Sequence, residues 1–216
     1  MSSKVKRLLP AFFSVLIPVF FVSCIGASSN ITINSNGGGT VTQEYRISLD
    51  LQDMGKTEET EDKLPVPMGK EDLERTVERV DGLRLLSFSS RQDDKDMFIK
   101  AEFAFDSPEA LMELMSQGDQ QIEFDLQGKK ITLHFPAGEK SDDAFADVII
   151  AAFLGYDFAL SFTLPEKAKA SWLDGNGQNV QKYPGTFSVN DRTVDFSVSM
   201  SDLMCLENAL DLVISW

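Results

Sequence analysis

The sequence predicts an α+β fold in a single domain, with a mostly antiparallel, curved sheet of about nine strands and about three helices. Apolar and polar residues alternate in many short segments, which is typical of half-buried strands. Short turns join most of these segments, which favours hairpins and therefore antiparallel pairing. No regular strand–helix–strand rhythm appears, so a parallel sheet is not expected. The chain has 216 residues, of which 43% are hydrophobic, and this suffices for one core.

The helices are predicted from their apolar stripes and their first residues. Residues 70–80 place Leu73, Val77 and Val80 on one stripe, and Ser107-Pro108-Glu109 begins a helix that runs to about residue 117. A third helix begins after residues 141–143 and ends near residue 155, and residues 201–206 form one helical turn. The strands are predicted at residues 40–51, 83–89, 97–105, 121–126, 130–135, 157–164, 185–189, 193–200 and 209–216, with a short one near 168–172.

The N-terminus has the pattern of a secretory signal peptide. The first seven residues carry three basic side chains and no acid, and residues 8–22 are apolar apart from Ser14 and two prolines. The alternative is a transmembrane anchor. A spanning helix needs about 20 apolar residues, and the two prolines disturb a helix, so the signal peptide is the preferred interpretation.

The end of this apolar run resembles the lipobox of bacterial lipoproteins. Phe21-Val22-Ser23-Cys24 places a small residue directly before a cysteine, although lipoboxes usually have Leu where Phe21 stands. The resemblance implies that residues 1–23 are removed and that Cys24 is lipidated; the alternative is an ordinary secretory signal. Residues 24–39 are uncharged and rich in Ser, Asn and Gly, which predicts a flexible tether before a domain at residues 40–216. We therefore expect a domain in the cell envelope, lipid-anchored to a membrane and facing the periplasm or the exterior.

Composition argues against several classes of protein. The net charge is −14, and removal of residues 1–23 leaves 17 basic and 34 acidic residues, a net charge of −17. Such a chain repels phosphate backbones, so no nucleic-acid partner is expected. One histidine and two cysteines are too few for a disulfide scaffold or a structural zinc site. We expect no cofactor, no metal site and no enzymatic activity.

Three positions have residue types that could serve in catalysis or metal binding, and each also has a structural interpretation. His134 lies on the strand face opposite Ile131, Leu133 and Phe135, which favours an outward-facing histidine over a catalytic base. Cys205 lies in an apolar run, which favours a buried thiol over a reactive one. Residues 174–179 resemble the first half of a calcium loop, but the twelfth position is Gly185 rather than Glu, so a hairpin loop is the preferred interpretation.

The third predicted helix is apolar on all sides between Val148 and Leu154. Its core stripe is formed by Phe145, Ile149 and Phe153, while Ile150 and Leu154 lie on other faces. Seven residues span about 10 Å, too short to cross a bilayer. The helix is either central to the core or lines a pocket for an acyl chain, or touches the membrane. Ile150 and Leu154 are the candidate contacts to an apolar ligand.

The domain resembles the LppM-like domain of bacterial cell-envelope lipoproteins. The resemblance rests on residues 38–41 leading into 45–50, on residues 105–111 between strand and helix, and on 162–165 and 192–196. It implies a lipid-binding α+β fold and no catalytic residues. The family's prototype has a C-terminal membrane segment that this chain lacks, so we expect anchoring through Cys24.

Three hypotheses on function follow. The first is a lipoprotein whose non-catalytic domain binds a lipid or another apolar ligand. The second is a structural or protein-interaction module of the envelope without a ligand cavity, and the third is an enzyme, which composition disfavours. A cavity lined by apolar side chains would favour the first, and a filled core the second.

Overall fold

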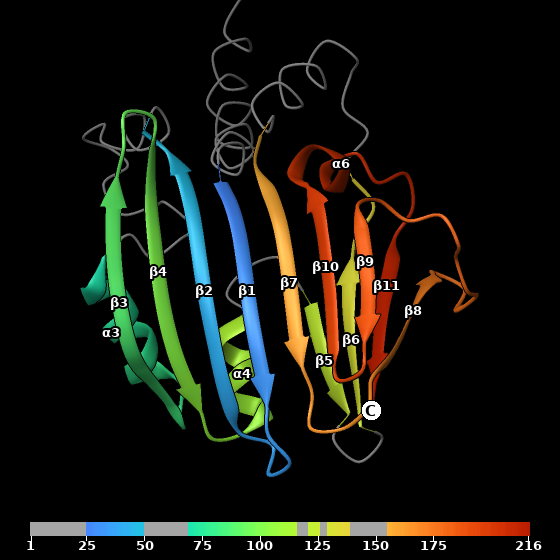
Figure 1. The fold of residues 1–216 in the computed structure, drawn as a ribbon, viewed down its shortest axis with the longest axis horizontal. Coiled ribbons are helices and arrows are strands. Elements are labelled where there is room, and N and C mark those ends of the chain that lie inside the picture. Colours follow the sequence, from blue (N-terminus) through green and yellow to red (C-terminus); the bar gives the residue numbers. More distant parts are fainter. Residues whose placement is uncertain (1–24, 50–68, 116–120, 126–128, 139–154) are drawn as a thin grey trace, which may run out of the picture.

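A computed structural model describes residues 25–49, 69–115, 121–125, 129–138 and 155–216 (Figure 1). Its larger sheet has seven strands in the order β3-β4-β2-β1-β7-β10-β9. All neighbours pair antiparallel except β1 and β7, which are parallel. The strands are β1 (Ile25–Ile33), β2 (Gly39–Ser48), β3 (Leu83–Gln92), β4 (Asp96–Phe105), β7 (Asp157–Thr163), β9 (Thr186–Asn190) and β10 (Thr193–Ser199).

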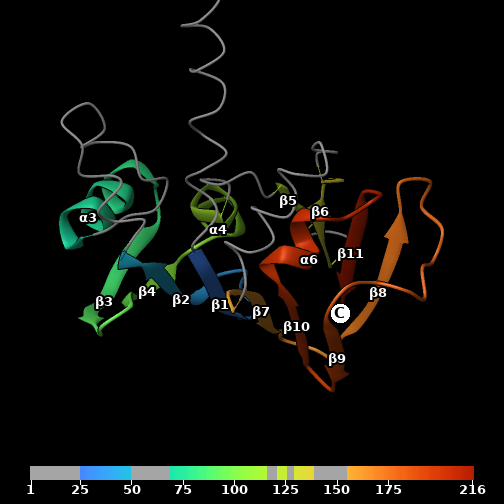
Figure 2. The ribbon, with the colours of Figure 1, turned by 90° about the horizontal axis from the view of Figure 1, so that it is seen from above.

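The smaller sheet has four antiparallel strands in the order β5-β6-β11-β8. The strands are β5 (Gln121–Asp125), β6 (Lys130–Phe135), β8 (Lys169–Asp174) and β11 (Leu210–Ser215). The described helices are α3 (Lys70–Arg79), α4 (Pro108–Met115) and α6 (Met200–Met204). Figure 2 shows α3, α4 and the smaller sheet on the same side of the larger sheet.

The core lies between these two layers. One side chain in two along the larger sheet points into it, such as Ile31 in β1, Val41 in β2 and Phe103 in β4, all at most 1% exposed. Helix α4 contributes Leu111, which is fully buried. Alternation of this kind buries one face of a sheet and leaves the other to solvent.

Aromatic side chains join the two sheets. Phe135 of β6 lies 5.5 Å from Phe196 of β10, centroid to centroid, and 6.3 Å from Phe158 of β7. Trp172 of β8 lies 5.0 Å from Phe196 and stacks on Tyr183. These distances are those of rings in direct contact, so aromatic side chains fill this part of the interior.

The predicted fold class is confirmed. The protein is α+β, its sheets are rich in antiparallel pairs, and the strands and helices form a single domain. The structure differs from the prediction in having two sheets, with eleven strands among the described residues rather than about nine in one sheet. The third predicted helix, residues 141–155, lies almost wholly outside the described residues.

The prediction of a flexible tether over residues 24–39 is wrong for residues 25–39. Residues 25–33 form β1, which pairs with β2 over nine residues and with β7 over six, and lies inside the larger sheet. Ile31 and Ile33 are 1% and 3% exposed, so their burial offsets the weak strand preference of the Ser, Asn and Gly residues. The Gly-rich stretch is the turn to β2, where Gly37 has a φ of 86°.

Candidate functional site

The outer face of the larger sheet carries the candidate site. Among the described residues, the helices and the smaller sheet all cover the opposite face (Figure 2). Three successive strands present small polar side chains here: β1 with Ser28, Asn30 and Thr32, β7 with Ser161 and Thr163, and β10 with Thr193 and Ser197. At the end of the sheet where β1 begins, this face also carries Arg46, Arg91 and Phe98.

That end holds a row of side chains in register across four strands, which we call the end row. Gly26 of β1 lies opposite Arg46 of β2, Arg46 opposite Phe98 of β4, and Phe98 opposite Arg91 of β3. Directly opposed residues share a face and stand close enough for their side chains to interact. The end row lines an open depression of about 600 Å³, together with Tyr156 and other residues.

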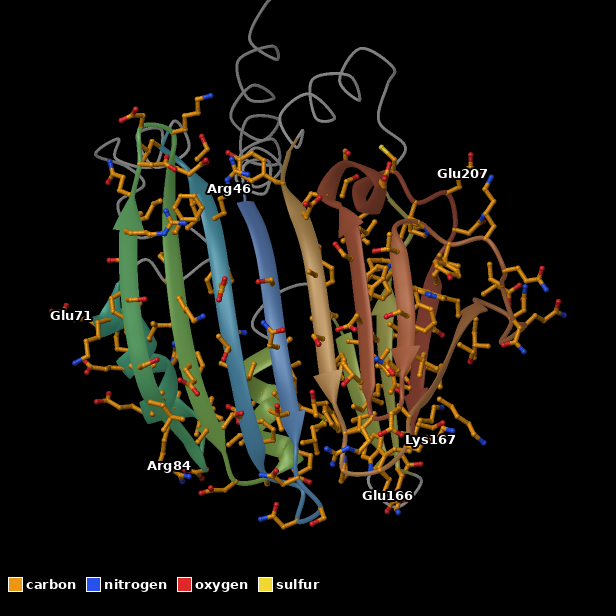
Figure 3. The ribbon with its side chains drawn as sticks, in the orientation of Figure 1. Arg46, Glu71, Arg84, Glu166, Lys167 and Glu207 are labelled. Carbon is orange, nitrogen blue, oxygen red and sulfur yellow. The ribbon has the colours of Figure 1, made fainter. Side chains whose placement is uncertain are left out.

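Arg46, which is labelled at this end of the sheet in Figure 3, forms a hydrogen-bonded cluster with Asp96 and Tyr156. Arg46 Nε and Nη2 donate to Asp96 Oδ2 at 2.9 and 2.7 Å, and Nη1 donates to the carbonyl oxygen of Gly155 at 2.9 Å. Tyr156 OH donates to Asp96 Oδ1 at 2.8 Å, and the guanidinium of Arg46 lies 4.8 Å from the Tyr156 ring centroid. The cluster therefore ties β2 and β4 to the residues that lead into β7, across β1.

The electrostatics of the cluster follow from these contacts. The hydrogen bond to Asp96 raises the pKa of Arg46, so the guanidinium stays charged. Burial, followed by the hydrogen bond to Asp96, raises the pKa of Tyr156 to about 12, so the phenol remains a donor at neutral pH. Asp96 is 3% exposed, and the bonds to Arg46 and Tyr156 compensate the burial of its carboxylate.

Gly26 makes room for this cluster. A Cβ at this position would lie 3.3 Å from the Asp157 carbonyl oxygen and 3.6 Å from the Tyr156 ring. The first of these contacts is tight, so the Asp157 backbone would have to shift by a few tenths of an ångström to admit the Cβ. The glycine is thus part of the site, although it carries no chemistry.

The rest of the depression contains two further cations. The Arg91 guanidinium lies 3.8 Å from the Phe98 ring centroid, a cation–π contact. Lys100 Nζ donates to Glu44 Oε1 at 2.6 Å. Within the part of the chain that the structure describes, Arg91 makes no ion pair with a carboxylate. Among the three cations that line the depression, Arg46 and Lys100 thus have carboxylate partners, whereas Arg91 contacts an aromatic ring.

The structure does not describe the predicted site residues. Cys24, Ile150 and Leu154 lie outside the described residues, so their predicted roles stay predictions. The described chain nevertheless begins at Ile25, the residue after Cys24, and resumes at Gly155, the residue after Leu154. Because β1 and β7 are parallel and Ala27 pairs with Phe158, the first residues of both strands lie at the end of the sheet that carries the end row.

The structure describes two other candidate positions, His134 and the loop that begins at Asp174. His134 lies on the face of β6 opposite Ile131, Leu133 and Phe135, as predicted, but it is half-buried. Nδ1 lies 2.8 Å from Asp211 Oδ1, and the buried Nε2 lies 3.6 Å from Glu123 Oε1, beyond hydrogen-bond length. Asp174 Oδ1 accepts hydrogen bonds from the backbone N–H groups of Asn176 and Gln178, both at 2.9 Å. The carboxylate therefore closes the turn that follows β8. These bonds, with the bond from Gln178 first, lower the pKa of Asp174.

The prediction that Cys205 is buried is wrong. Its side chain is exposed. Cys205 follows the last residue of the short helix α6 as its C-cap, and its backbone N–H donates to the carbonyl oxygen of Ser201.

The described residues offer neither a candidate metal site nor a helix that could span a membrane. They contain no group of three or more His, Cys, Asp or Glu side chains arranged to hold a metal ion. Their helices are all too short or too polar for a membrane span.

Comparison with protein-family models and with curated proteins found no match to this chain.

Local sequence patterns do not predict the cluster of Arg46, Asp96 and Tyr156. The alternation in residues 40–51 places Arg46 on the polar side of its strand but indicates no partner for it. Its partner lies 50 residues further on, and the pairing depends on the register between β2 and β4. The only local signal was a charged residue flanked by Tyr45 and Ile47.

Proposed function

We propose that this chain is a membrane-anchored bacterial lipoprotein whose envelope domain is not catalytic. The observation that carries the proposal is the apolar run that meets Ser23-Cys24 behind a basic N-terminus. The proposal that the domain is not catalytic is supported by the sequence, which has a single histidine and no motif of a Ser or Cys nucleophile.

We further propose that the domain acts as a structural or protein-interaction module of the envelope. This is supported by the contacts between Phe135, Phe158, Trp172 and Phe196, which occupy the space between the sheets. An acyl chain would have to displace these rings, at the cost of their mutual packing.

The alternative proposal is a domain that binds a lipid or another apolar ligand. The all-round apolar sequence from Val148 to Leu154 favours it, as does the resemblance to the LppM-like domain. Ile150 and Leu154 are then the contacts. Native mass spectrometry of the unlipidated domain distinguishes the two, because a co-purified lipid supports the ligand-binding domain and a bare mass supports the module.

The lipid anchor is tested by substituting each of the two cysteines in turn. We expect Cys24→Ala to abolish metabolic labelling with a fatty-acid analogue and to release the protein from the membrane fraction. Cys205→Ala is the matched control and should label and fractionate as the parent does. Labelling that survives Cys24→Ala would show that Cys24 is not the acylated residue.

A further inference from the structure

The path of the chain leaves no spacer between Cys24 and the folded domain. Ile25 already pairs with Ile47 of β2, and Gly26 pairs with Arg46. A residue spans at most about 3.6 Å, so the Cα of Gly26 lies within about 7 Å of the Cα of Cys24. If Cys24 carries the lipid, the end of the larger sheet where β1 begins lies at the headgroups of the bilayer.

The residues at that end have the chemistry of a headgroup contact. Arg46, Phe98 and Arg91 of the end row stand side by side on the outer face. Guanidinium groups offer paired N–H donors that match phosphate oxygens, and aromatic rings favour the membrane interface. The Arg46 side chain remains 43% exposed despite its bonds to Asp96, and Arg91 is exposed too.

The charge of the rest of the molecule makes a local contact necessary. The mature chain has a net charge of −17, so an anionic surface repels it as a whole. The turn between β3 and β4 adds Asp93 and Asp94 as well as Lys95 at this end. A contact here therefore depends on direct bonds from the Arg91 guanidinium to phosphate rather than on a broad positive field.

We propose that Arg91 contacts the phosphate groups of the phospholipid bilayer in which the lipidated Cys24 is anchored, with the Phe98 ring beside it at the membrane interface. The domain then stands with this end of the larger sheet on the membrane and the turn between β1 and β2 away from it. The ten residues of β2 span about 34 Å, so the two ends lie at clearly different heights above the bilayer. This inference rests on the proposed function, because it needs the lipid on Cys24.

The test measures the height of two labels above the membrane. The full lipidated chain, in a Cys205→Ser background, is reconstituted into phosphatidylcholine vesicles with and without phosphatidylglycerol. A fluorophore is attached to Asp94→Cys at the near end or to Ser35→Cys at the far end, and quenching by headgroup-labelled lipid is measured. We expect the near label to be quenched more strongly than the far label in both vesicles, and equal quenching would overturn the proposal.

A matched pair of charge reversals tests the end row itself. Arg91→Glu removes the exposed cation of the row, while Arg192→Glu makes the same change in the turn between β9 and β10, at the opposite end of the sheet. We expect Arg91→Glu to reduce the difference between the two labels and Arg192→Glu to leave it unchanged, with circular dichroism confirming that both variants fold. Equal effects of the two variants would refute a role for the row.

The labelling of Cys24 separates this inference from the proposed function. If fatty-acid labelling shows no acyl group on Cys24, the proposed lipoprotein itself is wrong. If Cys24 is acylated and the two labels are quenched equally, the anchor is correct and only the contact through the end row fails.

Discussion

Asp96 is the residue on which the contacts at the end row depend. Its carboxylate is almost wholly buried and accepts bonds from Arg46 and Tyr156, which come from segments on either side of β1. Asp93 stabilises the turn before it, since its Oδ1 accepts the backbone N–H groups of Lys95 and Asp96 at 2.9 Å. These backbone bonds, with that from Lys95 first, lower the pKa of Asp93.

Removal of the Asp96 carboxylate should destabilise the protein. Asp96→Ala leaves Arg46 and Tyr156 without their common acceptor, and we expect the free energy of unfolding in urea to fall by about 2 kcal/mol. The exposed half of Arg46 can still reach water, which keeps the loss below that of a fully buried pair. Asp94→Ala, an exposed carboxylate two residues away, is the control and should change stability by less than about 0.5 kcal/mol. Equal losses in the two variants would show that the cluster contributes nothing to stability.

Strand β1 is the element that holds the larger sheet together. It lies between β2 and β7 and supplies the only parallel pairing among the described strands. Without it, the three strands β3, β4 and β2 would have no hydrogen-bonded link to β7, β10 and β9. The residues expected to form a tether thus sit at the centre of the domain.

A pair of neighbouring substitutions in β1 separates a structural strand from a tether. Ile31→Ala removes a side chain that is 1% exposed, and we expect a loss of about 2–5 kcal/mol in the free energy of unfolding. Thr32→Ala changes the adjacent, exposed position and should cost less than about 0.5 kcal/mol. A tether would tolerate both changes, so an unchanged urea midpoint for Ile31→Ala would contradict the strand.

Elements with a strong local pattern were predictable from the sequence, and β1 was not. Helix α3 and strands β4, β6, β7 and β11 occur within one or two residues of their predicted bounds. The signal for β1 was restricted to Ile31 and Ile33, because the inward positions before them are Ala27 and Ser29. The order of the strands could not be predicted from local sequence patterns either, because the pairing of β1 with β7 joins residues more than 120 positions apart. The cluster of Arg46, Asp96 and Tyr156 could not be predicted for a similar reason, because its three residues are brought together only by long-range strand pairing.

At the scale of the whole molecule, the two sheets share one core. Strand β11, close to the C-terminus, lies between β6 and β8, so the smaller sheet is completed only when the last residues are in place. Its inward residues Leu212 and Ile214 are fully buried. The rings of Phe135 and Trp172 then pack against Phe158 and Phe196 of the larger sheet. Neither sheet can bury its apolar face without the other.

This shared core predicts that both sheets unfold in one transition. The chain has two tryptophans, and Trp216→Phe leaves Trp172, whose ring contacts Phe196 across the interface, as the single fluorescent reporter. In urea we expect the fluorescence of Trp172 and the far-UV circular dichroism of all strands to change with the same midpoint, because loss of the ring contacts exposes the apolar faces of both sheets at once. Trp172→Phe, which leaves Trp216 at the end of β11, is the companion variant and should likewise give coincident curves. A fluorescence transition that precedes the loss of circular dichroism would mean that the smaller sheet separates first, and the two sheets would then be independent units rather than one domain.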